Sequence, residues 1–104
     1  MLAKARAMKF VADVRQVGLI GAIELRDEAG QAFDTHWRVG GAVCRAMRDV
    51  KPVGLLLRPL GDVVVIMPPL AIEEKSLRQL CAGVLESLGG LGEIVACKRQ
   101  EARA

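Results

Sequence analysis

The sequence predicts an α+β fold, a small two-layer sandwich with the element order β-β-α-β-β-α. Two observations support this prediction. Short runs rich in β-branched residues come in two pairs, and a turn signal separates the members of each pair. Each pair is followed by a stretch whose apolar residues recur at helical spacing. Helices and strands of this kind bury their apolar sides by packing against one another, so we expect the helices to form a layer on the sheet.

Length and composition are those of one small domain, residues 1–104, without internal repeats or a low-complexity linker. Hydrophobic residues make up 52% of the chain and charged residues 26%, which excludes a disordered protein. No apolar run approaches the roughly 20 residues that a membrane-spanning helix needs. The first ten residues lack the apolar core of a signal peptide, so the sequence predicts a cytoplasmic protein.

The chain has three cysteines, Cys44, Cys81 and Cys97, and a single histidine. This set is too sparse and too widely spaced for a zinc site or a disulfide framework. We expect three free thiols that are buried or partly buried, and no metal.

A net charge of +3 raises the question of a nucleic-acid partner. The basic residues are spread along the chain, apart from small clusters near both ends, and only three residues are aromatic. No RNP-like, KH-like or helix-turn-helix pattern accompanies them. We therefore expect no nucleic-acid partner.

The first predicted elements are a helix and a pair of strands. Residues 1–10 are rich in Ala, Lys, Arg and Met, which favour helix. Residues 11–16 and 18–25 read as two short strands, followed by a polar turn at 27–31. The alternation in the second strand is imperfect, as expected of a strand covered on both faces.

A helix is predicted next, with Asp34 or Thr35 as its N-cap. Its apolar residues should face the sheet; they are Val39, Val43, Ala46, Met47 and Val50. Its arginines should face solvent; they are Arg38, Arg45 and Arg48. Gly40 and Gly41 weaken the prediction, because each glycine costs a helix about 1 kcal/mol. Pro52 should end the helix.

His36 and Trp37 stand at the start of this helix. They are consistent with the lining of a ligand pocket, or with a packing tryptophan beside a solvated histidine. The second interpretation is the one we favour.

The centre of the chain is the segment GLLLRPLGDVVVIMPPL, residues 54–70. Its apolar runs, 55–57 and 63–67, predict two strands, and the Pro/Gly/Asp cluster at 58–62 predicts the turn between them. The two prolines after Met67 end the second strand, because proline donates no hydrogen bond to a sheet.

Arg58 is the unusual residue of this segment, since it follows three leucines at the mouth of a strand pair. A guanidinium held on a rigid element suits bidentate binding of a carboxylate. The alternative is an ordinary arginine in solvent at the end of a strand.

The next predicted element is a helix that begins near Glu73 and Glu74, whose charges favour a helix N-terminus. Apolar residues then recur at i, i+3, i+4, i+7, i+8 and i+11; they are Leu77, Leu80, Cys81, Val84, Leu85 and Leu88. Gly89 and Gly90 should end this helix. Residues 93–98 fit either a last strand or a short helix.

Two stretches resemble a known family. The segment 54–72 and the segment VRQVGLIGAIEL at 14–25 are similar to the C-terminal small domain of class III pyridoxal-phosphate aminotransferases, which are fold-type I enzymes. The form RPLG…MPP points to the branch that makes 7,8-diaminononanoate in biotin synthesis, the adenosylmethionine–8-amino-7-oxononanoate aminotransferases. The resemblance covers roughly residues 8 to 88. It implies that residues 1–10 are the truncated end of a linking helix, and it departs at 49–53, where the family usually has a shorter link.

The resemblance also implies which functional residues lie in the small domain and which lie in the large domain. In that branch the arginine of the RP pair binds the carboxylate of the keto-acid substrate, and Arg58 occupies the matching position. The cofactor lysine, the acidic partner of the pyridinium and the phosphate-binding loop lie in the large domain of the resembled enzymes, which are homodimers. No lysine of this chain stands in such a context, and no other catalytic motif is present. We therefore expect no catalytic, cofactor-binding or metal-binding residue here, and no activity of the chain alone.

Two functions stay open at this point. The chain is either the C-terminal domain of an aminotransferase, with the large domain as its partner, or a stand-alone module that uses Arg58 to bind a small carboxylate or a protein. Apolar runs at 18–23, 53–57 and 63–67 suggest a sheet covered on both sides, whereas two helices can cover only one. This imbalance predicts self-association of the isolated chain.

Overall fold

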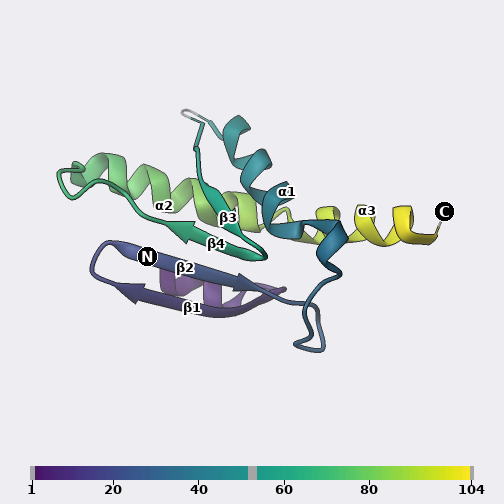
Figure 1. The fold of residues 1–104 in the computed structure, drawn as a ribbon. Coiled ribbons are helices and arrows are strands. Elements are labelled where there is room, and N and C mark those ends of the chain that lie inside the picture. The colour runs from purple at the N-terminus through teal and green to yellow at the C-terminus, as the bar shows by residue number, and fades with distance from the viewer. Residues whose placement is uncertain (1, 52–53, 104) are drawn as a thin grey trace.

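Four strands form one antiparallel sheet in the computed structural model, which describes residues 2–51 and 54–103 (Figure 1). The strands are β1 (Val11–Val17), β2 (Ile20–Leu25), β3 (Arg58–Leu60) and β4 (Val63–Ile66). Their order across the sheet is β1-β2-β4-β3, so each sequential pair is a hairpin and β3 forms one edge. Both hairpins turn at a glycine with positive φ, Gly18 and Gly61, a conformation that suits glycine because it has no Cβ.

The helical elements cover one face of this sheet and one end of it. They are η1 (Leu2–Ala7), η2 (Thr35–Trp37), α1 (Val39–Ala46), η3 (Met47–Asp49), α2 (Glu74–Leu88) and α3 (Leu91–Arg103). Figure 1 shows η1 and α2 behind the strands and α1 beside β3. The predicted α+β fold is confirmed.

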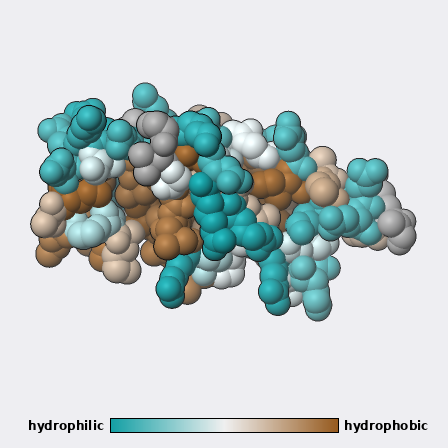
Figure 2. Space-filling model, turned by 90° about the horizontal axis from the view of Figure 1, so that it is seen from above, coloured by the Kyte–Doolittle hydropathy of each residue, from teal (hydrophilic) through white to brown (hydrophobic). Residues whose placement is uncertain are grey.

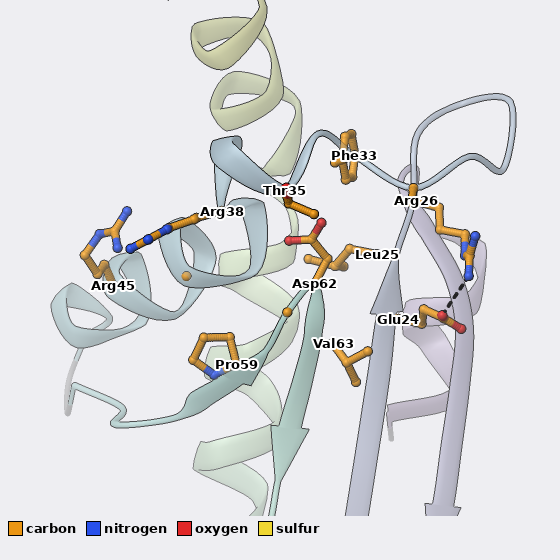
Figure 3. A pocket seen from close by; sticks show the side chains of 13 residues that line it. Glu24, Leu25, Arg26, Phe33, Thr35, Arg38, Arg45, Pro59, Asp62 and Val63 are labelled. Atoms are coloured by element: carbon orange, nitrogen blue, oxygen red, sulfur yellow. Dashed lines mark hydrogen bonds and ion pairs between the residues drawn. The ribbon is translucent and has the colours of Figure 1, made fainter.

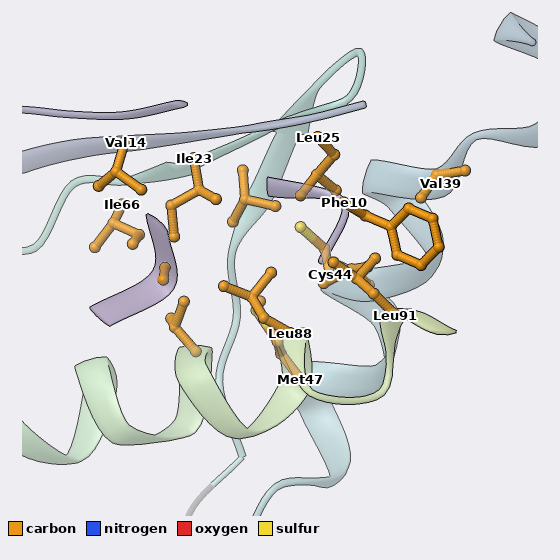
Figure 4. Packing of buried hydrophobic residues seen from close by; sticks show 14 of the residues in the cluster. Phe10, Val14, Ile23, Leu25, Val39, Cys44, Met47, Ile66, Leu88 and Leu91 are labelled. Carbon is orange, nitrogen blue, oxygen red and sulfur yellow. The ribbon is translucent and has the colours of Figure 1, made fainter. Parts of the chain in front are cut away.

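The hydrophobic core lies between the sheet and the helices (Figure 4). From the sheet, Val14, Ile23, Val64 and Ile66 point into it, and each is at most 3% exposed. Side chains of α1, η3, α2 and α3 close the core from the other side; among them are Val39, Cys44, Met47, Leu88 and Leu91. This is the layered packing that the apolar spacing predicts.

Two predictions near the strands are wrong in detail. The helix predicted at 1–10 is a 3-10 helix that ends at Ala7; that it is the truncated end of a linking helix stays a prediction. The third strand covers 58–60, not 55–57, so Arg58 belongs to the strand and the turn shrinks to Gly61 and Asp62. The reason is that the backbone N–H of Leu55 donates to the Met47 carbonyl (2.8 Å), which ties this segment to η3.

The first helix region also differs from the prediction. Asp34 accepts a hydrogen bond from the His36 N–H and so caps η2, while α1 begins four residues later, after Arg38. The buried residues of α1 include Cys44, whereas Ala46 is exposed. Successive residues of an α-helix are about 100° apart, and this spacing turns Ala46 about 90° away from the centre of the buried side of the helix. The predicted stop at Pro52 lies outside the described residues.

Other predictions in this region are confirmed. Val39, Val43 and Met47 are fully buried. Trp37 is half-buried against the core and the His36 side chain is almost fully exposed, which supports the packing interpretation of this pair.

α2 has the predicted extent and Gly89 is its C-cap. Residues 93–98, left open between strand and helix, lie in α3, which buries Leu91 and Val95 and then runs outward to the C-terminus (Figure 1). No helix among the described residues is long and apolar enough by itself to span a membrane. The helices α2 and α3, which follow each other with a bend between them, are together long and apolar enough by length and composition.

The three cysteines are free, and Cys44 and Cys81 are buried as expected. Burial raises the pKa of the Cys44 thiol. The prediction is wrong for Cys97, which is exposed because it lies on the part of α3 that turns away from the core.

Candidate functional site

The sheet face opposite the helices is the surface on which the predicted site residue lies. Because side chains alternate along a strand, the residues between the buried positions form this outer face. They are Asp13, Arg15, Val17, Ile20, Ala22, Glu24, Arg58, Leu60, Val63 and Val65. No described helix covers this face, which agrees with the prediction that the helices of this chain cover only one side of the sheet (Figure 1).

Arg58 stands on the outer face as the first residue of the edge strand β3. The pairing register places it beside Val65, which is followed across the sheet by Ala22 and Arg15. Val65 and Ala22, the two residues between the arginines, have short side chains, so the sheet surface between Arg58 and Arg15 is low. Arg58 itself is exposed.

The other charges of this face are paired with one another. Arg15 contacts Asp13 (2.8 Å) and Glu24 (3.1 Å), and Arg26 contacts Glu24 (3.0 Å). Hydrogen bonds from Arg26 and then Arg15 hold the pKa of the Glu24 carboxyl below its usual range, and the hydrogen bond from Arg15 does the same for the pKa of Asp13. Both carboxylates are therefore ionised at neutral pH and already matched to cations.

Arg58 differs from Arg15 in this respect. None of the ion pairs found among residues 2–51 and 54–103 involves it. Its guanidinium keeps a pair of parallel N–H groups for a ligand, which is the geometry that a carboxylate accepts in bidentate fashion. The Arg58 strand is anchored by its pairing with β4, and β4 lies in the interior of the sheet.

No lysine accompanies Arg58 on the strands of the sheet. None of the chain's five lysines lies on a strand; they are Lys4 in η1, Lys9 before β1, Lys51 after η3, Lys75 in α2 and Lys98 in α3. The cofactor requires a lysine beside the substrate. No group of metal-ligating side chains gathers among the described residues either.

A second charged site, which the sequence did not predict, lies between α1 and the β3–β4 turn (Figure 3). It is an open groove of about 610 Å³ whose wall includes Arg38 and Arg45. The prediction that these arginines are exposed is correct, but both also line this groove. The sequence predicted both arginines on the solvent side of one helix. Arg38 instead precedes α1 with left-handed backbone angles, so helical spacing did not reveal the groove.

Comparison with known proteins shows which enzymes the chain is similar to. No protein-family model matches the sequence. Adenosylmethionine-8-amino-7-oxononanoate aminotransferase of Geobacter sulfurreducens is 45% identical over 83 residues, which are 78% of this chain and 18% of that enzyme. The crystal structure of the enzyme of the same name from Methanocaldococcus jannaschii aligns with a TM-score of 0.73 at 31% identity, over 84% of this chain and 20% of that one.

The fold likeness extends beyond that enzyme. An omega-transferase from Vibrio fluvialis JS17 aligns with a TM-score of 0.81 at 26% identity, over 92% of this chain and 23% of that structure. The chain thus spans about a fifth of the length of the curated relatives and solved structures that it matches.

The chain is therefore related to the class III transaminases and corresponds to a small part of one. Within that class, its relatives in both sequence and fold are the adenosylmethionine-8-amino-7-oxononanoate aminotransferases, which confirms the resemblance inferred from the RPLG…MPP segment. That the matched part is a C-terminal domain stays a prediction.

Proposed function

We propose that this chain is the C-terminal small domain of a pyridoxal-phosphate-dependent aminotransferase that forms 7,8-diaminononanoate, and that Arg58 binds the carboxylate of its keto-acid substrate. The observation that carries the proposal is the guanidinium of Arg58, which is exposed on the uncovered sheet face without an ion-pair partner among the described residues. The relatives' name supplies the substrate, 8-amino-7-oxononanoate, which carries a carboxylate.

The cofactor belongs, in this proposal, to polypeptide outside the chain. Bound pyridoxal phosphate supplies the electron sink for the amino-group transfer. The chain contributes the anion-binding guanidinium and a sheet face of short apolar side chains, on which a large domain excludes water from the substrate. Excluding water strengthens the guanidinium–carboxylate pair, because charges attract more strongly at low dielectric.

Inactivity of the isolated chain follows from the positions of its lysines. We expect purified chain mixed with pyridoxal phosphate to transfer no amino group from S-adenosylmethionine to 8-amino-7-oxononanoate. We also expect no stoichiometric lysine adduct to survive dialysis, apart from weak nonspecific adducts on surface lysines. Absorbance spectra and a product assay measure both quantities. A stoichiometric adduct on one of the five lysines would contradict the proposal.

The competing function is the stand-alone module that binds a small carboxylate or a protein partner through Arg58. A pull-down from the source cell, resolved by mass spectrometry, separates the two functions. The aminotransferase proposal predicts recovery of a polypeptide with the large catalytic domain, either as a partner or continuous with this chain. Recovery of the chain without it would favour the module. The cytoplasmic location and the homodimeric enzyme stay predictions.

A further inference from the structure

We propose that the groove between α1 and the β3–β4 turn binds a small organic oxyanion, a phosphate or carboxylate with a short apolar body, between the guanidinium groups of Arg38 and Arg45. This site is separate from Arg58, which does not line the groove. The proposal is also independent of the proposed aminotransferase function.

Arg45 lies in α1, and Arg38 is the residue just before this helix. Figure 3 shows the guanidinium ends of the two side chains turned toward each other, above Pro59. Gly41 lies between them in the helix; a Cβ built there would stand 3.5 Å from the Arg45 Nη1 and 3.8 Å from the Arg38 Cβ. The Arg45 guanidinium therefore folds back over Gly41 toward the Arg38 stem, and two like charges are held in one region.

The carboxylates of the groove are already engaged elsewhere. Glu24 pairs with Arg26 (3.0 Å), and the Asp62 carboxylate accepts the backbone N–H of Gly40 (3.0 Å). None of the ion pairs found in the described parts of the chain involves Arg38 or Arg45. Two neighbouring cations without a counter-ion repel each other, and an anion bound between them relieves that repulsion.

Arg38 is also held in a conformation that costs energy. Its φ of 51° and ψ of 52° place it in the left-handed region. Glycine adopts this conformation freely and Asn and Asp adopt it readily, whereas other residues adopt it at a cost of about 1–2 kcal/mol. Glycine would suit this backbone better, but it would remove the guanidinium. The strained position is consistent with a functional side chain here.

The shape and lining of the groove indicate the class of ligand. Its volume of about 610 Å³ is within the range of small-molecule sites. Apolar side chains form part of its wall; they are Leu25, Phe33, Pro59 and Val63. An oxyanion head between the arginines would leave a short apolar body against this wall, whereas an inorganic ion would leave the wall uncovered.

Titration calorimetry of the full chain with inorganic phosphate and with phenyl phosphate tests the proposal. We expect both to bind at one site, with phenyl phosphate several-fold tighter because of the apolar wall. Arg45→Gln and Arg38→Asn should each weaken binding by about tenfold, since each removes a charge-assisted contact. Asparagine is the replacement at position 38 because it tolerates the left-handed backbone there. If Arg38→Asn does not fold, Arg45→Gln by itself still tests the proposal.

Arg48→Gln is the matched control. It removes an exposed arginine that does not line the groove, so this variant should bind phenyl phosphate as the unaltered chain does. Equal weakening in all three variants would show nonspecific attraction to a basic protein and would overturn the proposal. Absence of saturable binding would overturn it as well. Either failure leaves the role of Arg58 untouched, because the Arg58 test uses a different ligand and a different readout.

Discussion

The hydroxyl of Ser87 shows how a single residue departs from the packing rules of the core. Ser87 lies in the last turn of α2, is 8% exposed, and its Oγ has no hydrogen-bond partner among the described residues. A buried hydroxyl without a partner loses its bonds to water and gains nothing in return.

Ser87→Ala is therefore expected to stabilise the chain by about 1–2 kcal/mol, measured by urea unfolding. Ser76→Ala is the control, because Ser76 is an exposed residue of the same helix and its replacement gains only helix propensity, about 0.5 kcal/mol. Equal gains at the two positions would mean that the Ser87 hydroxyl carries no desolvation cost.

Arg58 shows what a single residue can indicate from sequence. Its neighbours Pro59 and Gly61 mark a turn, and three preceding leucines mark an apolar segment, so a cation at the mouth of a strand pair was predictable. The absence of Arg58 from the ion pairs of the described residues was not predictable from the sequence. That property depends on Asp13 and Glu24, which are distant in sequence and pair with Arg15 and Arg26 instead.

At the scale of elements, Gly40 and Gly41 have opposite roles although they are neighbours in α1. A Cβ built at Gly40 would lie 2.5 Å from the carbonyl oxygen of Gly61, in the β3–β4 turn. A Cβ at Gly41 meets nothing closer than 3.5 Å. The helix thus approaches the hairpin backbone so closely that only glycine fits at position 40, which the sequence showed merely as a weak point in a helix.

Gly40→Ala should destabilise the chain by about 1–3 kcal/mol, because the helix must move away from the turn. Gly41→Ala should stabilise it by about 0.5–1 kcal/mol through helix propensity. Thermal or urea unfolding of the two variants measures the difference. Stabilisation by both substitutions would show that α1 and the turn are not in close contact.

The sequence predicted the elements with strong periodicity better than their boundaries. The apolar spacing of α2 leaves no other interpretation, and its predicted extent is confirmed. The β3 strand moved by three residues because the backbone of Leu55 bonds to η3, a tertiary contact that local pattern does not reveal. Residues 93–98 were ambiguous because six residues carry less than two helical turns; in the structure they continue a 13-residue helix.

The uncovered sheet face determines whether the whole molecule associates with other copies of itself. Val17 and Leu60 on this face are 80% and 72% exposed, and Met67, just after β4, is 66% exposed. The view from above has α1 turned toward the viewer and not this face; hydrophobic surface is open there too, between hydrophilic side chains, while the end that holds the C-terminus is mostly hydrophilic (Figure 2). Apolar surface of this kind usually marks an interface.

We therefore expect the isolated chain to form dimers or larger oligomers at micromolar concentration. The association should persist at high salt, since apolar contact drives it and charge screening does not weaken it. Sedimentation velocity over a dilution series, at low and high salt, measures this. A monomer at every concentration would favour the stand-alone module, and dissociation by salt would point to charged contacts.

The central claim is that Arg58 binds the substrate carboxylate, and steady-state kinetics of the assembled aminotransferase test it most directly. Arg58→Ala should lower kcat/KM for 8-amino-7-oxononanoate by about ten- to a hundredfold, which corresponds to the 1.5–3 kcal/mol of a charge-assisted bond, while the amino donor is affected far less. Arg58→Lys should recover only part of the loss, because an ammonium lacks the planar pair of donors. Arg48→Ala, an exposed arginine away from the outer face, should change neither substrate. Equal losses for both substrates would show a structural role, and an unchanged response to the keto acid would show that Arg58 is a solvated strand-end residue.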